Sequence, residues 1–398
     1  MKKIAKAVYS GGARIVPRSL KPVLQPFAKS LRQFFESAAV APDLMLQPVK
    51  TIDSQQCRPR VLHVIANFML GGSSRLVMDL VENLGDEYDH KVVTCFLPSP
   101  PAYVGVDITE LRSPRSHEDV LTFLREYSPN IVHVHYWGDC DFWWYDILFK
   151  AAQTLGCRVI ENVNTPVAPY QVDFIDYYVH VSSYVQRQFG DGSAKNMTIY
   201  PGSDFSLFAK HENYPVPSDC IGMVYRLEND KLNKKSIDVF VKVVQRRPKT
   251  KVIIVGGGSY LEHYRKAAQK GGVESHFEFT GYVEYAKLPR FYARLNIFVA
   301  PVWKESFGQV SAFAMNMNIP VVGYNIGGLA EIVQDPSLLA MPENSDELAE
   351  IIIQLLDDPE RCRQIGLRNA KRAQSVFSVE AMINSYGKLY ADLIGTSK

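Results

Sequence analysis

The sequence lacks long apolar runs and paired cysteines, and each absence excludes a class of protein. No segment reaches the ~18 uncharged apolar residues that span a bilayer, so we expect no transmembrane helix. The six cysteines stand singly, without the C-x-x-C spacing of a zinc or redox site, and are too sparse for a disulfide scaffold. We therefore expect reduced thiols in a cytoplasmic protein without a cleaved signal peptide.

Acidic residues are missing from the beginning of the chain. Residues 1–35 carry eight lysines or arginines and no aspartate or glutamate, whereas the rest balances 36 basic against 42 acidic residues. After Pro26, which suits a first helical turn, four apolar residues recur at helical spacing: Phe27, Leu31, Phe34 and Phe35. This basic amphipathic segment can contact an anionic membrane surface, or its apolar stripe can dock on the protein's own core. Nucleic acid is not an expected partner, because the remaining chain is acidic.

The remaining chain has the composition of a folded α/β protein. Over the full sequence, 46% hydrophobic and 22% charged residues exclude disorder and fibrous architecture for most of the chain, and 398 residues predict about two to three domains. From residue 60, short apolar runs alternate with helical periods: the runs are 61–66, 91–96, 130–135, 158–160, 177–181, 220–225, 251–255, 276–279, 296–300 and 319–322. This alternation predicts parallel sheets covered by helices on both faces. The expected fold is therefore two doubly wound, Rossmann-like domains that face a cleft.

Domain boundaries follow from a stretch rich in proline and acid at 210–219. We predict an N-terminal arm over 1–58, a first domain over 59–210 and a second domain over 211–378. The last segment, 379–398, is expected to form a helix that crosses back to the first domain. Ligands of such sheets bind beyond the carboxyl ends of the strands, so the loops after the strands are the candidate sites.

Two of these loops suit an anion. Gly71 and Gly72 lie between a strand and a helix, where backbone amides can approach a ligand, although a plain tight turn is an equal interpretation. In the second domain, Arg226 follows a strand, and Lys231 and Lys235 follow it within a polar loop. Fixed cations suit a diphosphate, but a solvated charged loop has the same composition.

A third loop suits a sugar. Glu305 lies at a strand-to-helix turn that ends in Gly308, so its carboxylate could hold sugar hydroxyls; a plain charge at a helix N-terminus, worth ~0.3–1 kcal/mol, is the alternative. His133 and His135 alternate with valines along a strand, and we expect them to be structural. The aromatic residues between 136 and 145 are expected to be core, or to stack on an acceptor.

These loops, in their order and spacing, resemble the donor-binding domain of the family 4 (group 1) retaining glycosyltransferases, which have the GT-B fold. The resemblance is carried by Tyr225-Arg226-Leu227, Lys235-Ser236, Gly256-Gly257-Gly258-Ser259, Phe279-Thr280-Gly281-Tyr282-Val283, Glu305-Ser306-Phe307-Gly308 and Gly327 to Glu331. In the first domain, Gly71 to Arg75 and Tyr200 to Asp204 resemble the family's glycine loop and P-N-G-V-D turn.

The resemblance implies particular roles. Glu305, Arg226 and Lys235 would be catalytic, with the two cations stabilising the departing diphosphate. The donor would contact Gly71, Gly72, Lys231, Gly257, Tyr282, Val283, Ser306, Phe307, Gly308 and Gln309. Neither a metal nor another cofactor is implied. The partners would be a nucleotide-diphosphate sugar and a sugar or lipid-linked sugar acceptor.

Three positions depart from the family's pattern. Phe313 stands where a second acidic residue usually binds the ribose, and Asn164 stands where a histidine is usual. The loop after Arg226 is longer than usual, which leaves Lys231 and Lys235 competing for the diphosphate.

The predicted function is retaining sugar transfer in surface polysaccharide or glycolipid assembly, in the cytoplasm and peripherally on the inner membrane face. Phe313 and Asn164 motivate an alternative, a weakly active or inactive subunit that binds a partner enzyme. An epimerase or phosphorylase on the same fold is a third interpretation.

Overall fold

A computed structural model describes residues 58–112, 116–136, 138, 141–164, 167–209 and 219–395. The basic amphipathic segment predicted within residues 1–35 lies outside the described residues. Within the described ranges, no helix combines the length and apolarity needed to cross a bilayer.

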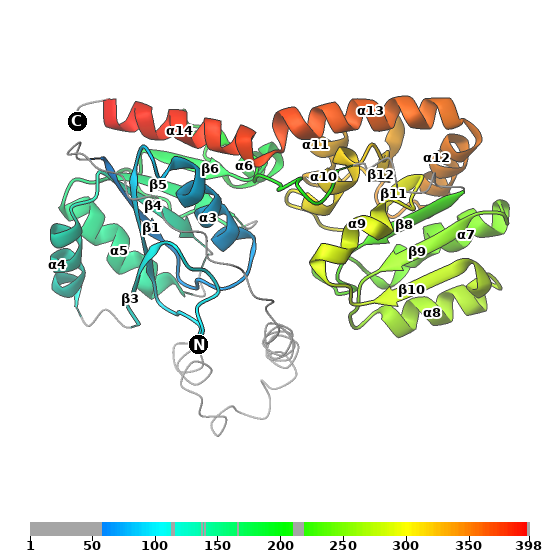
Figure 1. The fold of residues 1–398 in the computed structure, drawn as a ribbon, viewed down its shortest axis with the longest axis horizontal. Helices are drawn as coiled ribbons and strands as arrows, with labels where there is room; N and C mark the ends of the chain where they lie inside the picture. The colour runs from blue at the N-terminus through cyan, green and yellow to red at the C-terminus, as the bar shows by residue number, and fades with distance from the viewer. Residues whose placement is uncertain are drawn as a thin grey trace, which may run out of the picture. The chain divides into compact units, whose positions relative to one another are not determined.

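The first domain is built on a seven-stranded parallel sheet with the order β3-β2-β1-β4-β5-β6-β7 (Figure 1). Its strands are β1 (Arg60–Val64), β2 (Asp89–Thr94), β3 (Asp107–Glu110), β4 (Ile131–Tyr136), β5 (Arg158–Val163), β6 (Tyr177–His180) and β7 (Asn196–Thr198). Its helices are α3 (Gly72–Leu84), α4 (His117–Tyr127), α5 (Phe142–Thr154) and α6 (Ser183–Phe189). Every residue of β4 is buried, as expected for a strand covered on both faces.

The second domain has a six-stranded parallel sheet with the order β10-β9-β8-β11-β12-β13. Its strands are β8 (Cys220–Val224), β9 (Lys251–Val255), β10 (Phe277–Gly281), β11 (Ile297–Ala300), β12 (Val321–Tyr324) and β13 (Leu339–Ala340). Its helices are α7 (Asp238–Arg246), α8 (Leu261–Lys270), α9 (Leu288–Tyr292), α10 (Gln309–Asn316), α11 (Leu329–Val333), α12 (Ser345–Asp357) and α13 (Pro359–Val376). The predicted fold class, two parallel-sheet α/β domains, is confirmed.

Different helices pack on the two faces of the first sheet. Side chains alternate along a strand, so Leu62 of β1 packs with α4 and α5, whereas Val61 packs with α3 and the last helix, α14 (Val379–Gly395). Tyr386 and Tyr390 of α14 are buried in this second cluster. The chain's last helix thus completes the core of its first domain.

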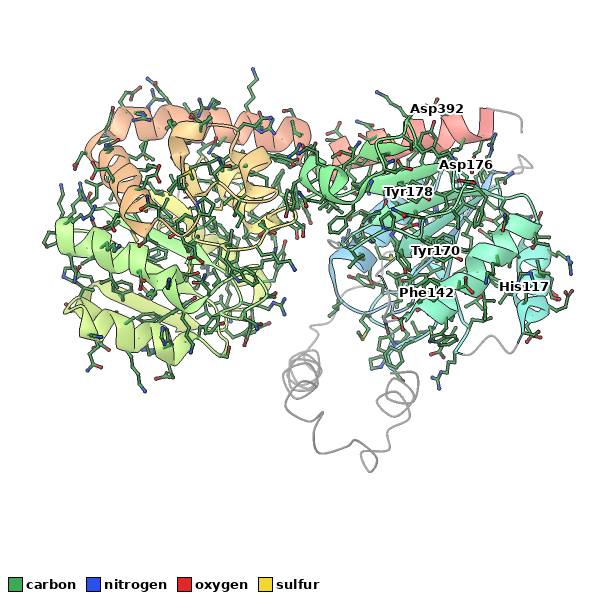
Figure 2. All side chains as sticks on the ribbon, turned by 180° about the vertical axis from the view of Figure 1, so that it is seen from behind. His117, Phe142, Tyr170, Asp176, Tyr178 and Asp392 are labelled. Atoms are coloured by element: carbon green, nitrogen blue, oxygen red, sulfur yellow. The ribbon has the colours of Figure 1, made fainter. Side chains whose placement is uncertain are left out.

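The face under α5 buries one carboxyl group, that of Glu161 on β5. Both of its oxygens accept a hydrogen bond from the backbone amide of Tyr170, at 3.0 and 3.1 Å; Figure 2 labels Tyr170 on this domain. The Tyr170 ring stacks on Phe149 of α5 at 4.3 Å and helps to exclude water. Burial raises the pKa of Glu161 to about 8, so the carboxyl group is mostly protonated at pH 7.

We expect Glu161→Gln to remove a pH dependence from the protein's stability. The folded pKa of about 8 lies above the ordinary value of 4.5, so between these values the folded state holds one more proton than the unfolded state. The stabilisation due to this proton is complete below pH 4.5 and is lost as the pH rises towards 8, by about 1.4 kcal/mol per pH unit.

The measurement is urea denaturation of the wild type and Glu161→Gln at pH 6 and pH 8. Between these two conditions the variant should gain about 2 kcal/mol relative to the wild type. Glu87→Gln, at an exposed glutamate of the same domain, is the control and should follow the wild type. A difference between Glu161→Gln and wild type that stays constant with pH would contradict a protonated Glu161.

Candidate donor site in the second domain

Backbone hydrogen bonds join the loops after β8 and β9. Tyr225 donates its amide to Val255 O at 3.1 Å, and Leu227 donates to Gly257 O at 2.9 Å. A Cβ atom at Gly256, whose φ is +133°, would lie 1.9 Å from Tyr225 O. Only glycine allows this approach, and it fixes the backbone around Arg226.

The loop after β10 joins the same edge of the sheet. Gly256 donates its amide to Gly281 O at 3.0 Å. Gly257 lies close to the backbone of Tyr282: a Cβ atom added at Gly257 would lie 3.3 Å from the Tyr282 nitrogen. Tyr282 is 75% exposed, whereas Val283 packs against the core. Of these two predicted donor contacts, the exposed tyrosine has the freer side chain.

Arg226 presents its guanidinium to solvent at this edge. Its side chain is 71% exposed, and its charged partner is Asp230 at 2.6 Å, four residues along the loop. An exposed pair of this kind is worth little in water. An anionic ligand can therefore take over the guanidinium at small cost.

Glu305 lies in the loop after β11 and is paired with Lys231. Its Oε1 is 2.5 Å from Lys231 Nζ, and Glu305 is only 2% exposed. Trp303 ties the two loops together, since its backbone amide donates to Lys231 O at 3.0 Å and its indole donates to Leu232 O at 3.0 Å. The structure thus brings together two charges that lie 74 residues apart in the sequence.

The turn at Glu305 leaves one carboxylate oxygen available. Oε1 also accepts from the amide of Ser306 at 3.0 Å and faces that of Phe307 at 3.4 Å. Oε2 is buried and has no hydrogen-bond partner among the described residues. A buried carboxylate oxygen without a partner is costly, which is the state expected of a group that accepts hydrogen bonds from a ligand.

Gly327 and Gly328 pack closely against the backbone of this turn. Gly328 donates its amide to Glu305 O at 2.9 Å. A Cβ at Gly327 would lie 2.1 Å from Glu305 O, and one at Gly328 would lie 2.2 Å from Ser306 O. The Gly-Gly pair therefore serves to position Glu305.

Helix α10 begins directly after the turn. Its N-cap is Gly308, with φ +105°, and no described side chain caps the helix. Free amides at a helix start favour an anion. The Phe307 ring packs on Tyr200 and Phe377, so only its backbone is available to a donor. Gln309 is exposed, and its side-chain Nε2 donates to Gly202 O at 3.3 Å, which leaves its backbone amide available.

Lys235 occupies a different environment from Lys231. Its side chain is 75% exposed, and its charged neighbour is Glu343 at 3.9 Å. Both line a cavity of about 340 Å³ whose described lining includes neither Arg226 nor Glu305. Of the two competing lysines, the structure brings Lys231 and not Lys235 into contact with Glu305.

Phe313 is part of an aromatic core. Its ring stacks on Phe208 at 4.0 Å and lies edge-on to Phe205 and Tyr285. It is 4% exposed. No carboxylate can occupy this position on α10, so a ribose would have to be recognised by other groups.

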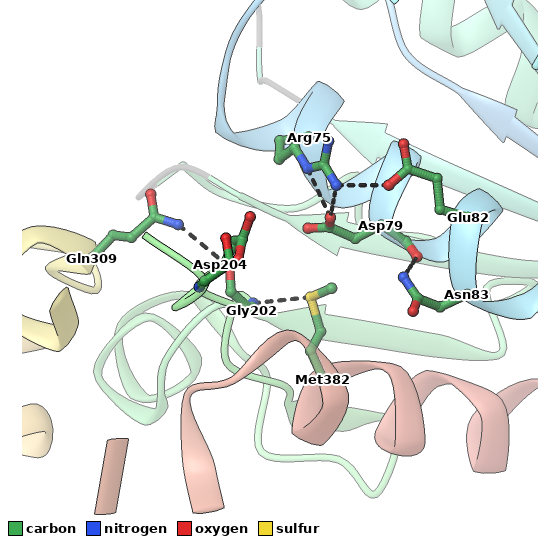
Figure 3. Close-up of polar contacts among 9 residues, drawn as sticks. Arg75, Asp79, Glu82, Asn83, Gly202, Asp204, Gln309 and Met382 are labelled. Atoms are coloured by element: carbon green, nitrogen blue, oxygen red, sulfur yellow. Dashed lines mark hydrogen bonds and ion pairs between the residues drawn. The ribbon is translucent and has the colours of Figure 1, made fainter. Parts of the chain in front are cut away.

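The glycine loop of the first domain precedes α3. Gly71 and Gly72 are exposed, and no described side chain caps this helix. Arg75 in its first turn is held by Asp79 at 2.5 Å and Glu82 at 2.7 Å, as Figure 3 shows. Because two carboxylates hold Arg75, the backbone amides are the available donors of this loop.

The carboxyl group of Asp79 is buried beside Arg75. Burial raises its pKa more than the charge of Arg75 lowers it, and the resulting pKa of Asp79 is about 6.

One structural role was missed from the sequence. Glu331 accepts hydrogen bonds from the amide of Ser183 at 2.9 Å, from that of Tyr184, and from the hydroxyl of Tyr200 at 3.0 Å. It therefore binds the start of α6 and the segment after β7. The signal in the sequence, an acid after Gly-Gly, does not identify partners about 130 to 150 residues away.

Comparison with known proteins gives a family match for the second half of the chain. Residues 207–372 match the family described as "Glycosyl transferases group 1". D-inositol 3-phosphate glycosyltransferase 2 of Catenulispora acidiphila is 28% identical over 53% of this chain and 53% of its own length. A GDP-mannose-dependent monoacylated alpha-(1-6)-phosphatidylinositol monomannoside mannosyltransferase of Corynebacterium glutamicum is 26% identical over 52% of this chain and 60% of its own. The chain thus spans about half to three fifths of these relatives.

Solved structures share the fold over most of the chain. Anabaena HepE in complex with UDP has a TM-score of 0.71 at 18% identity, covering 84% of this chain and 100% of that one. Sucrose-phosphate synthase of Thermosynechococcus elongatus has a TM-score of 0.68 at 20% identity, covering 85% and 100%. The second half of the chain is therefore similar to the group 1 glycosyltransferases, and the chain shares the GT-B fold of these solved structures.

Proposed function

We propose that the protein transfers a sugar from a nucleoside diphosphate donor to an acceptor hydroxyl with retention of configuration, as in family 4. The observation that carries this proposal is the contact of Lys231 with Glu305, 2.5 Å apart, on a turn fixed by Gly327 and Gly328. A cation and a carboxylate held together in this way can bind the two ends of one donor.

In this proposal, Arg226 and Lys231 bind the diphosphate of the donor. Both reach the carboxyl edge of the sheet, from segments that backbone hydrogen bonds hold in place. As the bond to the sugar breaks, negative charge grows on the departing diphosphate, and prearranged cations stabilise that charge. The amides at Gly308 and Gln309 add to the positive potential, so no metal is needed for this step.

Glu305 orients the donor sugar. Its Oε1 is engaged by Lys231 and two amides, and its Oε2 is the oxygen left to accept a sugar hydroxyl. The exposed Tyr282 loop is the position for the base, and the Gly71–Gly72 amides are further donors from the first domain.

The donor is proposed to be a UDP- or GDP-sugar. The fold neighbour HepE was solved with UDP and with UDP-glucose, and the Corynebacterium relative is named as GDP-mannose-dependent. That relative's name also gives a phosphatidylinositol mannoside as acceptor, which supports a lipid-linked acceptor and a role in glycolipid or surface polysaccharide assembly at a membrane.

The test is an assay of nucleoside diphosphate release from UDP-glucose and GDP-mannose, with detergent-solubilised membrane lipids as acceptors. Release that depends on added lipid, with a labelled glycolipid product of retained anomeric configuration, is the expected result. A protein that binds a nucleotide but transfers no sugar would support the alternative of a non-catalytic subunit, which the buried Phe313 favours.

A further inference from the structure

Four histidines cluster on the face of the first sheet that α3 and α14 cover. His63 of β1 and His133 of β4 are register partners, and His135 lies two residues further along β4 on the same side. His90 of β2 completes the cluster, with its ring centroid 5.2 Å from that of His63. His90 is 8% exposed and the other three are 0% exposed, and none belongs to the proposed donor site.

The spacing of three of these rings suits a single metal ion. One nitrogen from each of His63, His133 and His135 lies within 4.8 Å of the other two. His63 Nδ1 and His135 Nε2 are 3.4 Å apart, which is long for a hydrogen bond. With zinc–nitrogen bonds of about 2.0–2.1 Å, the ligand nitrogens of a tetrahedral site are roughly 3.3 Å apart.

Two of the three rings, His63 and His133, have a hydrogen-bond partner outside the trio, as metal-binding histidines usually do. A histidine that binds a metal through one nitrogen usually donates a hydrogen bond through the other. His63 Nε2 faces His90 Nδ1 at 3.0 Å, and His133 Nδ1 faces the hydroxyl of Tyr390 at 2.7 Å. Each of these two rings thus keeps a partner for one nitrogen. The other nitrogen of His63 has the 3.4 Å contact to His135, and that of His133, Nε2, faces Asn162 Oδ1 at 3.3 Å, and a metal ion would replace these two long contacts.

His135 is poorly satisfied by the protein alone. Its Nδ1 is buried and has no partner among the described residues, and its Nε2 has the 3.4 Å contact to His63. A neutral imidazole needs one donor and one acceptor partner, and leaving a buried polar atom unpaired costs about 1–3 kcal/mol.

We propose that His63, His133 and His135 bind one Zn²⁺ ion as a structural site, with a water molecule as the fourth ligand. Imidazole nitrogens suit zinc, and three of them on a pair of parallel strands would join β1 to β4. Through His133 and Tyr390 the ion would also stabilise the docking of α14 on the first domain. The site plays no part in sugar transfer, which depends on the second domain and Arg226, Lys231 and Glu305.

The test is metal uptake by full-length protein from which any polyhistidine tag has been removed. After treatment with a chelator, the protein should take up one equivalent of Zn²⁺ per chain, measured by elemental analysis, and its melting temperature should rise. Co²⁺ in place of Zn²⁺ should give the intense visible absorption of a four-coordinate site. Uptake well below one equivalent, or the weak spectrum of six-coordinate Co²⁺, would overturn the proposal.

Matched variants locate the ion. His63→Gln should lose the equivalent of Zn²⁺, whereas His180→Gln, at a buried histidine of β6 outside the cluster, should keep it. Circular dichroism of the metal-free variants shows whether each is folded. Retention of one equivalent by folded His63→Gln would mean that the metal binds elsewhere. If His63→Gln does not fold, His135→Gln and the wild-type Co²⁺ spectrum decide the outcome.

Discussion

Replacing Glu305 with glutamine is expected to lower the turnover of sugar transfer by about 10²–10³-fold, the loss typical of one transition-state contact. Glutamine has nearly the same shape, so its side-chain oxygen can still accept from the amide of Ser306, which lies 3.0 Å from Oε1. The substitution removes the negative charge that pairs with Lys231 at 2.5 Å and that, in the proposed site, holds a sugar hydroxyl. Turnover therefore falls while the turn keeps its structure.

The measurement is the initial rate of nucleoside diphosphate release at saturating donor and acceptor. Glu343→Gln is the matched control, because its side chain is 63% exposed on the same domain and does not contact Glu305 in the structure. It should keep wild-type turnover. If Glu305→Gln also kept wild-type turnover, Glu305 would be a helix N-terminal charge and not a contact of the reacting sugar.

Replacing Lys231 with alanine is expected to reduce turnover by about 10²-fold and to weaken donor binding as well. In the proposed site Lys231 has two roles, since its ammonium would neutralise the diphosphate and it also holds Glu305 Oε1. Lys235→Ala removes an equal charge only four residues away, but that side chain is 75% exposed and its charged neighbour is Glu343. Lys235→Ala should therefore stay within about twofold of the wild type.

The comparison of the two lysine variants decides between the two assignments left open by the sequence. Both variants are measured with the same donor concentration series, so that turnover and the Michaelis constant are separated. The opposite order, with Lys235→Ala strongly impaired and Lys231→Ala nearly unchanged, would mean that the diphosphate lies on the side of the cavity near Glu343.

The fold was predictable because its central strands are buried on both faces. The runs predicted at 130–135 and 251–255 lie on β4 and β9, which are almost wholly buried. β3 (Asp107–Glu110), β7 (Asn196–Thr198) and β13 (Leu339–Ala340) were missed. β3 is a half-exposed edge strand that begins with an acid, β7 is an edge strand of three residues, and β13 has two residues. None of them forms an apolar run long enough to be recognised.

The site was predictable in its residue types but not in its pairings. Glycines at 256, 327 and 328 could be interpreted as positions where two backbone segments approach closely. In the structure, a Cβ atom added at any of them would lie within 2.2 Å of a backbone oxygen. The choice between Lys231 and Lys235 could not be made, because it depends on how Trp303 anchors the loop at 231–232. The histidine cluster was equally hidden, since it depends on the register between β1 and β4.

The most direct test of a donor site at Arg226, Lys231 and Glu305 is a thermal-shift titration of the wild type and Lys231→Ala with UDP and GDP. Binding to the folded state alone stabilises it by about 2.7 kcal/mol at a ligand concentration of 100 Kd. We predict a concentration-dependent rise in Tm with one of the two nucleotides for the wild type, and little or no rise for Lys231→Ala. No rise with either nucleotide, or an equal rise in both proteins, would contradict the assignment of this site.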